Sequence, residues 1–307
     1  MQELASGITG RSMQVASDTD MSGEMATELY LDLLKKCLTA SIYDESSWWV
    51  VGRERIDALK HPPSKWDVIQ LARAWTQRFV IGQLRKRSLL LVRQARFSLE
   101  AREGGVDWPC FGYTMTGHRR LEVLKSCIQD VLARQVPGDF IETGCWRGGT
   151  TIFMRAVLRA YGVTDRTVWV ADSFEGMPRP DGLRDGWDFS SVEYLRVSLD
   201  QVRASFDRFG LLDDKVRFLP GWFKDTLPSA PIQKLSILRL DGDLYHSTMD
   251  ALKNLYFKAS PGAYVIVDDY YGWEGCRRAV DEFLCENRIQ TRIERIDSGS
   301  VYWRVPE

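Results

Sequence analysis

Short aliphatic runs alternate with longer amphipathic stretches along the chain from residue 139 to its end. The aliphatic runs predict buried strands, because each is short and rich in β-branched or other aliphatic residues. Apolar residues at helical spacing predict helices between them. The expected strands are residues 140–142, 167–171, 216–219, 235–240 and 263–267, and the expected helices are residues 150–161, 191–209, 247–257 and 275–287.

This alternation implies an α/β fold with a mostly parallel sheet that is covered by helices on both faces. The last two runs differ, since residues 292–296 and 300–305 flank the turn sequence Asp297-Ser298-Gly299. Such spacing predicts a C-terminal antiparallel hairpin. We therefore expect a Rossmann-like sheet that ends in a hairpin.

The first part of the chain has a different pattern. Residues 1–24 are rich in Ser, Thr, Gly and Asp, which predicts a disordered or tag-like segment. Helical spacing predicts amphipathic helices over 28–39 and 119–134. We therefore divide the chain into the segment 1–24, an N-terminal helical extension over 25–137 at a subunit interface or over the active site, and an α/β core over 138–307.

Charge excludes some partners. The formal net charge is −1, so no overall field favours nucleic acid. Residues 60–96 carry nine Lys or Arg against the single acid Asp67. Such a stretch suits a nucleic-acid or membrane-surface helix, but a solvated helix that packs on a partner subunit fits better, because no other basic surface matches it. We expect no nucleic-acid or membrane partner, and a homo-oligomer that is a dimer or a tetramer.

The cysteines and the apolar runs indicate the compartment. The six cysteines show neither C-x-x-C nor a zinc-like spacing, which is typical of reduced thiols in the cytosol. No apolar run reaches membrane-spanning length, and residues 1–20 lack the apolar core of a signal peptide. The sequence therefore predicts a cytoplasmic protein.

Two acidic pairs follow neighbouring predicted strands. Asp241 and Asp243 flank Gly242, and Asp268 and Asp269 follow the strand 263–267. Parallel strands hold ligands at their carboxyl ends, and four like charges gathered there would repel one another without a cation such as Mg²⁺. Taken singly, Asp-Gly-Asp is typical of a turn and Asp-Asp of a helix start. Two such runs at one edge favour a metal site.

A glycine-bearing turn lies between the first core strand and the next helix, over residues 140–150. It lacks the G-x-G-x-x-G spacing of pyrophosphate sites. Asp172 ends the second strand, where a carboxylate suits ribose hydroxyls, and Glu142 beside the turn favours a cationic ligand. S-adenosylmethionine (SAM) carries a ribose, a sulfonium and an ammonium but no phosphate. The alternative is an ordinary turn with solvated acids.

Four ordered motifs, over residues 138–149, 172–178, 240–248 and 264–270, together resemble the macrocin/mycinamicin-type sugar O-methyltransferases. The resemblance runs from about residue 27 to the end of the chain. That family consists of class I enzymes that depend on SAM and Mg²⁺ and act in macrolide and aminocoumarin antibiotic pathways. The resemblance implies a class I methyltransferase core over 138–307 and a small-molecule glycoside acceptor.

The resemblance also assigns roles to single residues. It implies that Asp241, Asp268 and Asp269 hold Mg²⁺ and that Asp243 is the general base. It places the SAM site at the glycine turn and the end of the second strand. With their neighbours in the turn, the predicted SAM-binding residues are Met115, Glu142, Thr143, Gly144, Arg147, Gly148, Asp172, Ser173 and Trp222.

The residues themselves suggest how a sugar hydroxyl would react. Coordination to Mg²⁺ lowers the pKa of the hydroxyl, and a carboxylate then takes its proton as the oxygen attacks the methyl group. Asp241 and Asp243 can divide these tasks, the first towards the metal and the second towards the acceptor. His246, three residues beyond Asp243, is the competing base. The charged segment from residue 179 onward, with Glu193 and Tyr194, is a candidate cover for the acceptor.

Functions of other classes are also considered. A catechol-type O-methyltransferase would share the metal, the cofactor and the fold, but would take a flat aromatic diol. A glycosyltransferase can hold a metal–sugar-nucleotide complex with Asp-x-Asp, but it leaves Asp268, Asp269 and the glycine turn without a role. A non-catalytic binding protein would need neither acidic pair.

Overall fold

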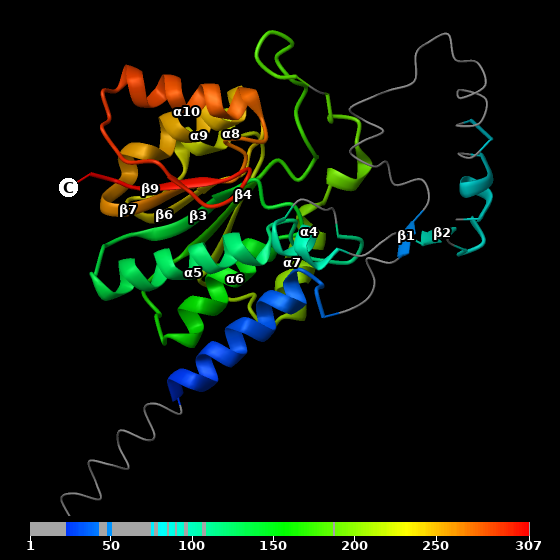
Figure 1. The fold of residues 1–307 in the computed structure, drawn as a ribbon, viewed down its shortest axis with the longest axis horizontal. Helices are drawn as coiled ribbons and strands as arrows, with labels where there is room; N and C mark the ends of the chain where they lie inside the picture. The colour runs from blue at the N-terminus through cyan, green and yellow to red at the C-terminus, as the bar shows by residue number, and fades with distance from the viewer. Residues whose placement is uncertain are drawn as a thin grey trace, which may run out of the picture.

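The computed structural model describes residues 23–42, 48–50, 75–76, 79–84, 86–89, 91–94, 98–105, 109–186 and 188–306. Of the segment 1–24 that is predicted to be disordered or tag-like, residues 1–22 lie outside the described residues, as does most of the basic stretch 60–96, whereas residues 23 and 24 begin a helix. A sheet forms the middle layer, with α8, α9 and α10 on one side and α5 and α6 on the other (Figure 1). The helices have the bounds α4 Leu99–Glu103, α5 His118–Ala133, α6 Gly149–Ala160, α7 Leu199–Arg208, α8 Phe223–Thr226, α9 Tyr245–Leu255 and α10 Glu274–Glu286.

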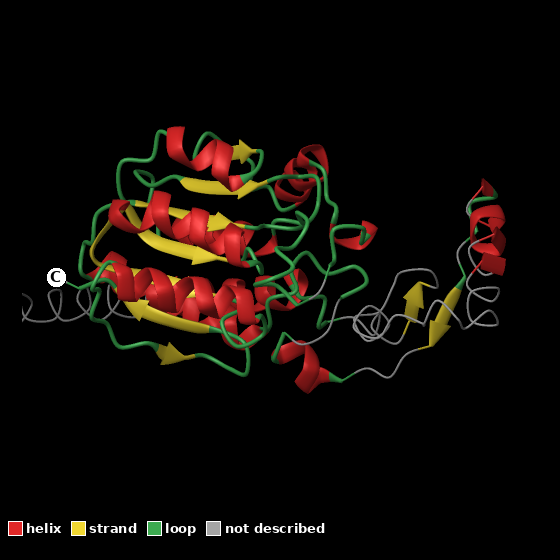
Figure 2. Ribbon diagram, turned by 90° about the horizontal axis from the view of Figure 1, so that it is seen from above, coloured by secondary structure: helices red, strands yellow, loops and turns green. Residues whose placement is uncertain are grey.

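The main sheet has seven strands in the order β5-β4-β3-β6-β7-β9-β8. The strands are β3 Asp139–Thr143, β4 Val168–Asp172, β5 Val216–Pro220, β6 Leu235–Leu240, β7 Ala259–Val267, β8 Glu294–Arg295 and β9 Val301–Arg304. The first five in this order pair in parallel, and β9 pairs antiparallel with both β7 and β8. Figure 2 shows helices lying over these strands from a second direction. The predicted mostly parallel sheet with an antiparallel C-terminal hairpin is confirmed.

The order of the strands reverses beside β3. The chain moves outward from β3 to β4 and β5, and then crosses back to place β6 on the other side of β3. In open α/β sheets, a ligand crevice forms at the carboxyl ends of the strands at such a switch point. The glycine turn follows β3 and the Asp-Gly-Asp run follows β6, so both predicted motifs lie at this point.

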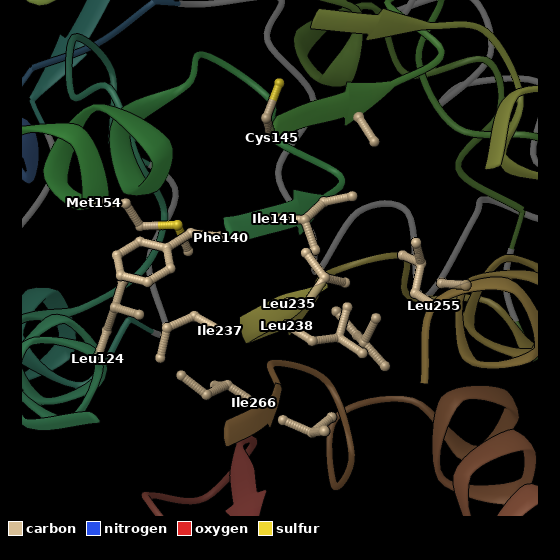
Figure 3. Packing of buried hydrophobic residues seen from close by; sticks show 14 of the residues in the cluster. Leu124, Phe140, Ile141, Cys145, Met154, Leu235, Ile237, Leu238, Leu255 and Ile266 are labelled. Atoms are coloured by element: carbon tan, nitrogen blue, oxygen red, sulfur yellow. The ribbon is translucent and has the colours of Figure 1, made fainter. Parts of the chain in front are cut away.

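A large apolar core lies between the main sheet and the helices that cover it (Figure 3). Phe140 and Ile141 of β3 are fully buried in it. A helix over residues 23–38 adds Leu31 and Leu38, which are also fully buried. Each such side chain stabilises the fold by roughly 1.5–3 kcal/mol. The N-terminal helix therefore shares the core of the sheet, and it begins five residues earlier than the sequence predicts.

The predicted helix over 191–209 is wrong in its first half. The structure has a short 3₁₀ turn over Glu193–Leu195, and α7 begins only after Ser198. The Ser198 hydroxyl accepts a hydrogen bond from the Gln201 N–H, and the Gln201 side chain bonds back to the Ser198 N–H. This capping box fixes a helix start at that position.

Among the residues that the structure describes, no helix is both long enough and apolar enough to cross a membrane.

Candidate active site

Two adjoining cavities lie at the carboxyl ends of the central strands. The first has a volume of about 570 Å³, and the second has a volume of about 300 Å³. They share six lining residues: Met115, Trp146, Met177, Leu195, Asp241 and Asp243. A ligand in each cavity would therefore meet the other beside two aspartates.

The glycine turn borders the first cavity through Gly144. At Gly144 the backbone of the turn also approaches the backbone of Asp241, at the end of β6, very closely. Gly144 has a φ of +90°, and a Cβ atom at this position would overlap the carbonyl oxygen of Asp241. Only glycine combines that conformation with so close an approach. The Asp241 N–H donates to the Thr143 carbonyl at 2.9 Å, so the turn and the Asp-Gly-Asp run are held together.

Asp172 at the end of β4 lines the first cavity and also orders the glycine turn. One carboxylate oxygen accepts hydrogen bonds from the N–H groups of Cys145 at 2.8 Å and Trp146 at 3.3 Å. The other oxygen accepts one from Phe174 N–H at 2.8 Å. Burial raises the pKa of Asp172, although these three bonds oppose the shift.

Three carboxylates gather in the second cavity. Asp241, Asp268 and Asp269 each offer one oxygen, and these oxygens lie within 4.8 Å of one another. Asp268 is 7% exposed, and the buried Oδ2 atom of Asp269 has no hydrogen-bond partner. Hard oxygen donors at this spacing fit Mg²⁺, and the orphaned Oδ2 atom offers a ligand position that the protein leaves unsatisfied.

Two buried arginines stand beside these carboxylates. Arg239 on β6 is 1% exposed and donates to Asp241 Oδ2 at 2.7 Å and to Thr116 Oγ1 at 2.9 Å. It also donates to Glu142 and Asp268. Arg120 on α5 bonds the second oxygen of Asp268. The guanidinium groups therefore fix the orientation of the carboxylates from behind.

With all its groups ionised, the cluster would carry an excess of negative charge. Arg120 and Arg239 supply two positive charges against the five carboxyl groups of Glu142, Asp241, Asp243, Asp268 and Asp269, and Arg120 also pairs with Asp297. Burial and repulsion raise the pKa of Asp243 and Asp269 well above the usual value, and burial raises that of Glu142 to about 8. Burial works in the same direction on Asp268, but Arg120 and Arg239 outweigh it and lower its pKa. A divalent cation would offset two of the three excess negative charges of the fully ionised groups.

Asp243 occupies the junction of the cavities in an unusual backbone conformation. Its φ is +55°, in the left-handed region that residues other than glycine seldom adopt. The Leu244 N–H donates to the Gly242 carbonyl at 2.5 Å and closes the tight turn. This turn lets Asp241 face the acid cluster while Asp243 borders both cavities.

His246 lies apart from the acid cluster. It borders the first cavity, and its Nε2 atom is 3.3 Å from Asp181 Oδ2. Its side chain is 62% exposed. The geometry therefore brings Asp243 to the acid cluster and directs the His246 ring towards the segment that contains Asp181.

The remaining predicted SAM-binding residues are divided between the two sides. Ser173 and Trp222 line the first cavity, Met115 lines both cavities, and Glu142 borders the second. Three others line neither cavity. Thr143 is fully buried, Arg147 donates to the carbonyls of Cys110 and Gly112, and Gly148 is the N-cap residue of α6, with a φ of +84°.

The segment after β4 crosses both cavities. Phe189, Val192 and Tyr194 form a small apolar cluster against Trp146 and Trp273. Trp146 Nε1 donates to the Tyr194 carbonyl at 3.0 Å, which ties the segment to the glycine turn. Tyr194 thus joins the cover, whereas Glu193 is exposed.

The sequence analysis does not identify several residues at this site, among them Arg120, Trp146, Asp185, Phe189, Arg239 and Trp273. Arg239 had a signal, since a charge within the aliphatic strand Leu235–Leu240 requires buried partners. Asp185 had none, because its partner Tyr245 is 60 positions away.

Residues 27–305 match the model of the family described as macrocin-O-methyltransferase (TylF). The 8-demethyl-8-(2,3-dimethoxy-alpha-L-rhamnosyl)-tetracenomycin-C 4'-O-methyltransferase of Streptomyces olivaceus is 45% identical over 291 residues, which cover 92% of this chain and 94% of that protein. The mycinamicin III 3''-O-methyltransferase of Micromonospora griseorubida is 41% identical over 291 residues, which cover 92% of this chain and 99% of that protein.

A solved structure is also similar. The O-methyltransferase NovP superposes with a TM-score of 0.73 and 40% sequence identity, over 92% of this chain and 100% of that chain.

Proposed function

Because the chain belongs to the macrocin-O-methyltransferase family and is a SAM-dependent O-methyltransferase, we propose that it methylates a hydroxyl of a deoxysugar on a natural product. Membership of this family overturns two alternatives from the sequence, the Asp-x-Asp glycosyltransferase and the non-catalytic binding protein. The names of two relatives specify sugar positions, 4' and 3'', which supports a sugar acceptor here.

One observation carries the proposal: the acid cluster lies where the two cavities meet. We assign the larger cavity to SAM, since it contains the glycine turn and Asp172. We assign the smaller cavity to the acceptor, since it contains Asp268, Asp269 and the aromatic side chains Phe189 and Trp273. The two rings pack edge to face with centroids 5.2 Å apart and offer an apolar wall to a sugar ring.

We assign Mg²⁺ to Asp241, Asp268 and Asp269. When bound, the ion would orient neighbouring hydroxyls of the acceptor and lower the pKa of the reacting one. Arg120 and Arg239 hold the ligand carboxylates in place through the contacts described above. Glu142 supports the cluster through Arg239 and not by contact with the cofactor cavity.

Asp243 acts as the general base in this proposal. The acceptor hydroxyl gives its proton to the Asp243 carboxylate as its oxygen forms a bond to the methyl carbon, and the bond between that carbon and sulfur breaks. Asp243 borders both cavities, so it can reach a hydroxyl that faces the methyl group. The segment Phe189–Leu195 covers the cavities and keeps water from the reacting atoms.

The acceptor class can be tested directly. Purified protein, SAM and Mg²⁺ would be incubated with a 6-deoxyhexosyl natural product and, in parallel, with a catechol of similar size. We expect S-adenosylhomocysteine and a mono-methylated glycoside, with methylation located on the sugar by tandem mass spectrometry. Methylation of the catechol but not of the glycoside would favour the catechol-type alternative.

A further inference from the structure

A single carboxylate in the covering segment joins the starts of α9 and α10. Asp185 is 8% exposed and lies in a turn over 181–185, where its N–H donates to the Asp181 carbonyl at 2.8 Å. Its Oδ1 atom accepts a hydrogen bond from the Tyr245 backbone N–H at 2.8 Å. Its Oδ2 atom accepts one from the Asp181 N–H at 2.9 Å. Both oxygens of Asp185 are therefore fixed.

Asp185 supplies the cap that α9 lacks in its own sequence. The N-cap residue of α9 is Leu244, which has no side-chain acceptor. The first N–H groups of a helix require acceptors from outside, and an acidic group there also complements the helix dipole. The bond from Tyr245 to Asp185 meets both needs.

The start of α10 is shaped to admit this carboxylate. A Cβ atom at Gly275 would overlap Asp185 Oδ1 and lie 3.1 Å from the Tyr245 nitrogen. The same turn also contacts the first residues of α9 through side chains. The Arg184 guanidinium lies 4.5 Å from the centre of the Tyr245 ring, and Asp181 pairs with His246.

The contact with Tyr245 lies at the end of the turn that carries Asp243. The first end of that turn is held by the bond between Asp241 and Thr143 of β3. The left-handed backbone of Asp243 costs free energy, which the surroundings must offset. Asp185 holds the other end, where α9 begins.

We propose that Asp185 is a positioning residue for methyl transfer, which holds the Asp241–Leu244 turn so that the Asp243 carboxylate stays at the junction of the cavities. The proposal rests on the proposed role of Asp243 as the base. It also explains why residue 275 is a glycine.

The first experiment combines kinetics with hydrogen exchange. Asp185→Ala should lower kcat by about 10-fold to 100-fold, the loss expected from a small displacement of a reacting group. The KM for SAM should change by less than about threefold, because such a loss is specific to the transition state. Backbone amides over residues 241–250 should exchange faster. Asp185→Asn keeps one acceptor oxygen and should recover most of kcat.

A matched control lies in the same segment. Asp188 is exposed and accepts a hydrogen bond from the Ser190 N–H at 2.8 Å, within its own loop. Asp188→Ala should leave both kcat and the exchange over 241–250 as in the wild type.

Gly275→Ala tests the same contact without removing the carboxylate. The new methyl group would displace Asp185 from Tyr245, so the variant should lose kcat as Asp185→Ala does. Added to Asp185→Ala, it should cost less than it does alone, since the overlap with Asp185 Oδ1 is then gone and only the 3.1 Å approaches to the Tyr245 nitrogen and the Arg184 carbonyl oxygen remain. If the losses of kcat from the two substitutions were fully additive in the double variant, Asp185 and Gly275 would act independently, which would contradict the shared contact.

The remaining outcomes separate this proposal from the proposed function. Unchanged hydrogen exchange of the backbone amides over residues 241–250 in Asp185→Ala would overturn the positioning role. A normal kcat in Asp185→Ala would also overturn it if Asp243→Asn lowers kcat. Normal kcat in Asp243→Asn would overturn the assignment of the base, and this proposal with it.

Discussion

Arg239 donates to the Asp241 carboxylate at 2.7 Å from a position two residues earlier in the chain. The same side chain stands opposite Glu142 in the parallel pairing of β3 and β6, and it also contacts Asp268 after β7. One buried cation on the central strand therefore joins acidic residues from three strands. It orders the carboxylates of the cluster before any metal is bound.

Removing this cation should destabilise the fold. Arg239→Met would leave Glu142 without its buried partner and Asp268 with Arg120 alone, and removing one partner of a buried pair costs about 3–5 kcal/mol in comparable cases. Urea unfolding followed by circular dichroism would measure the free energy of unfolding. Arg217→Met, on an exposed position of β5, serves as the control and should change it by less than about 0.5 kcal/mol. An effect of Arg239→Met no larger than the control would contradict the structural role of the arginine.

Loss of a metal ligand should separate turnover from cofactor binding. Asp241→Asn should abolish or nearly abolish turnover, because it removes one ligand charge, while the first cavity keeps Asp172 and the glycine turn. EDTA should inactivate the wild type, and added Mg²⁺ should restore it. Calorimetry should show SAM binding close to that of the wild type. Full activity in EDTA after extensive dialysis would exclude the metal-dependent mechanism.

Asp172→Ala should weaken SAM binding by roughly 1–3 kcal/mol, as expected when buried hydrogen-bonding groups lose a charged acceptor. Two effects contribute, the lost ribose contact and the unpaired N–H groups of Cys145 and Trp146. Calorimetric titration with SAM is the measurement, with the exposed Asp165→Ala as the control. Equal affinity in Asp172→Ala and the wild type would mean that the acid neither reads the ribose nor orders the turn.

A salt bridge away from the site should make stability depend on pH. Burial opposes ionisation of Asp213, but hydrogen bonds from Arg155, one of them 2.6 Å long, hold its pKa below the usual value. Such a carboxyl group stabilises the protein at pH values above its pKa in the unfolded chain, which is about 3.9. This contribution is lost as the pH falls through the lower pKa of the folded protein.

Asp213→Asn should therefore lower the free energy of unfolding at pH 7 by roughly 1 kcal/mol, a value reduced for partial exposure. The difference from the wild type should shrink below about pH 4. Asp214→Asn, whose native side chain is 79% exposed, is the control at the neighbouring position. A constant difference between the Asp213 variant and the wild type from pH 7 to pH 3 would contradict the assignment.

The strands and the acidic pairs that follow them could be predicted because their sequence signals are local. Leu235–Leu240 is an unbroken buried strand with the bounds that its pattern predicts. The acidic pairs follow strands directly, so their meeting at one edge needs only a parallel sheet. The oligomeric state and the cytoplasmic location have no such link to the structure of one chain, and they stay predictions.

The contacts between distant segments could not be predicted. Glu142 belongs with Arg239 because of the register between β3 and β6, which neither strand specifies alone. Asp185 reaches Tyr245 through a loop with no regular pattern. The role of Asp172 in ordering the glycine turn likewise depends on backbone N–H groups, which no side-chain motif reveals.

The two candidate bases can be separated by paired substitutions. Asp243→Asn should lower kcat by about 10²–10⁴, the usual contribution of a general base, because the amide cannot take a proton from the acceptor hydroxyl. Metal affinity should fall far less than in Asp241→Asn, Asp268→Asn or Asp269→Asn, and titration with Mn²⁺ would measure it. His246→Ala should reduce kcat less than tenfold, since the ring is exposed and pairs with Asp181 in the covering segment. The pH dependence of kcat should keep its shape in His246→Ala, because no essential proton acceptor has been removed. A larger loss of kcat in His246→Ala than in Asp243→Asn would mean that the two roles are exchanged.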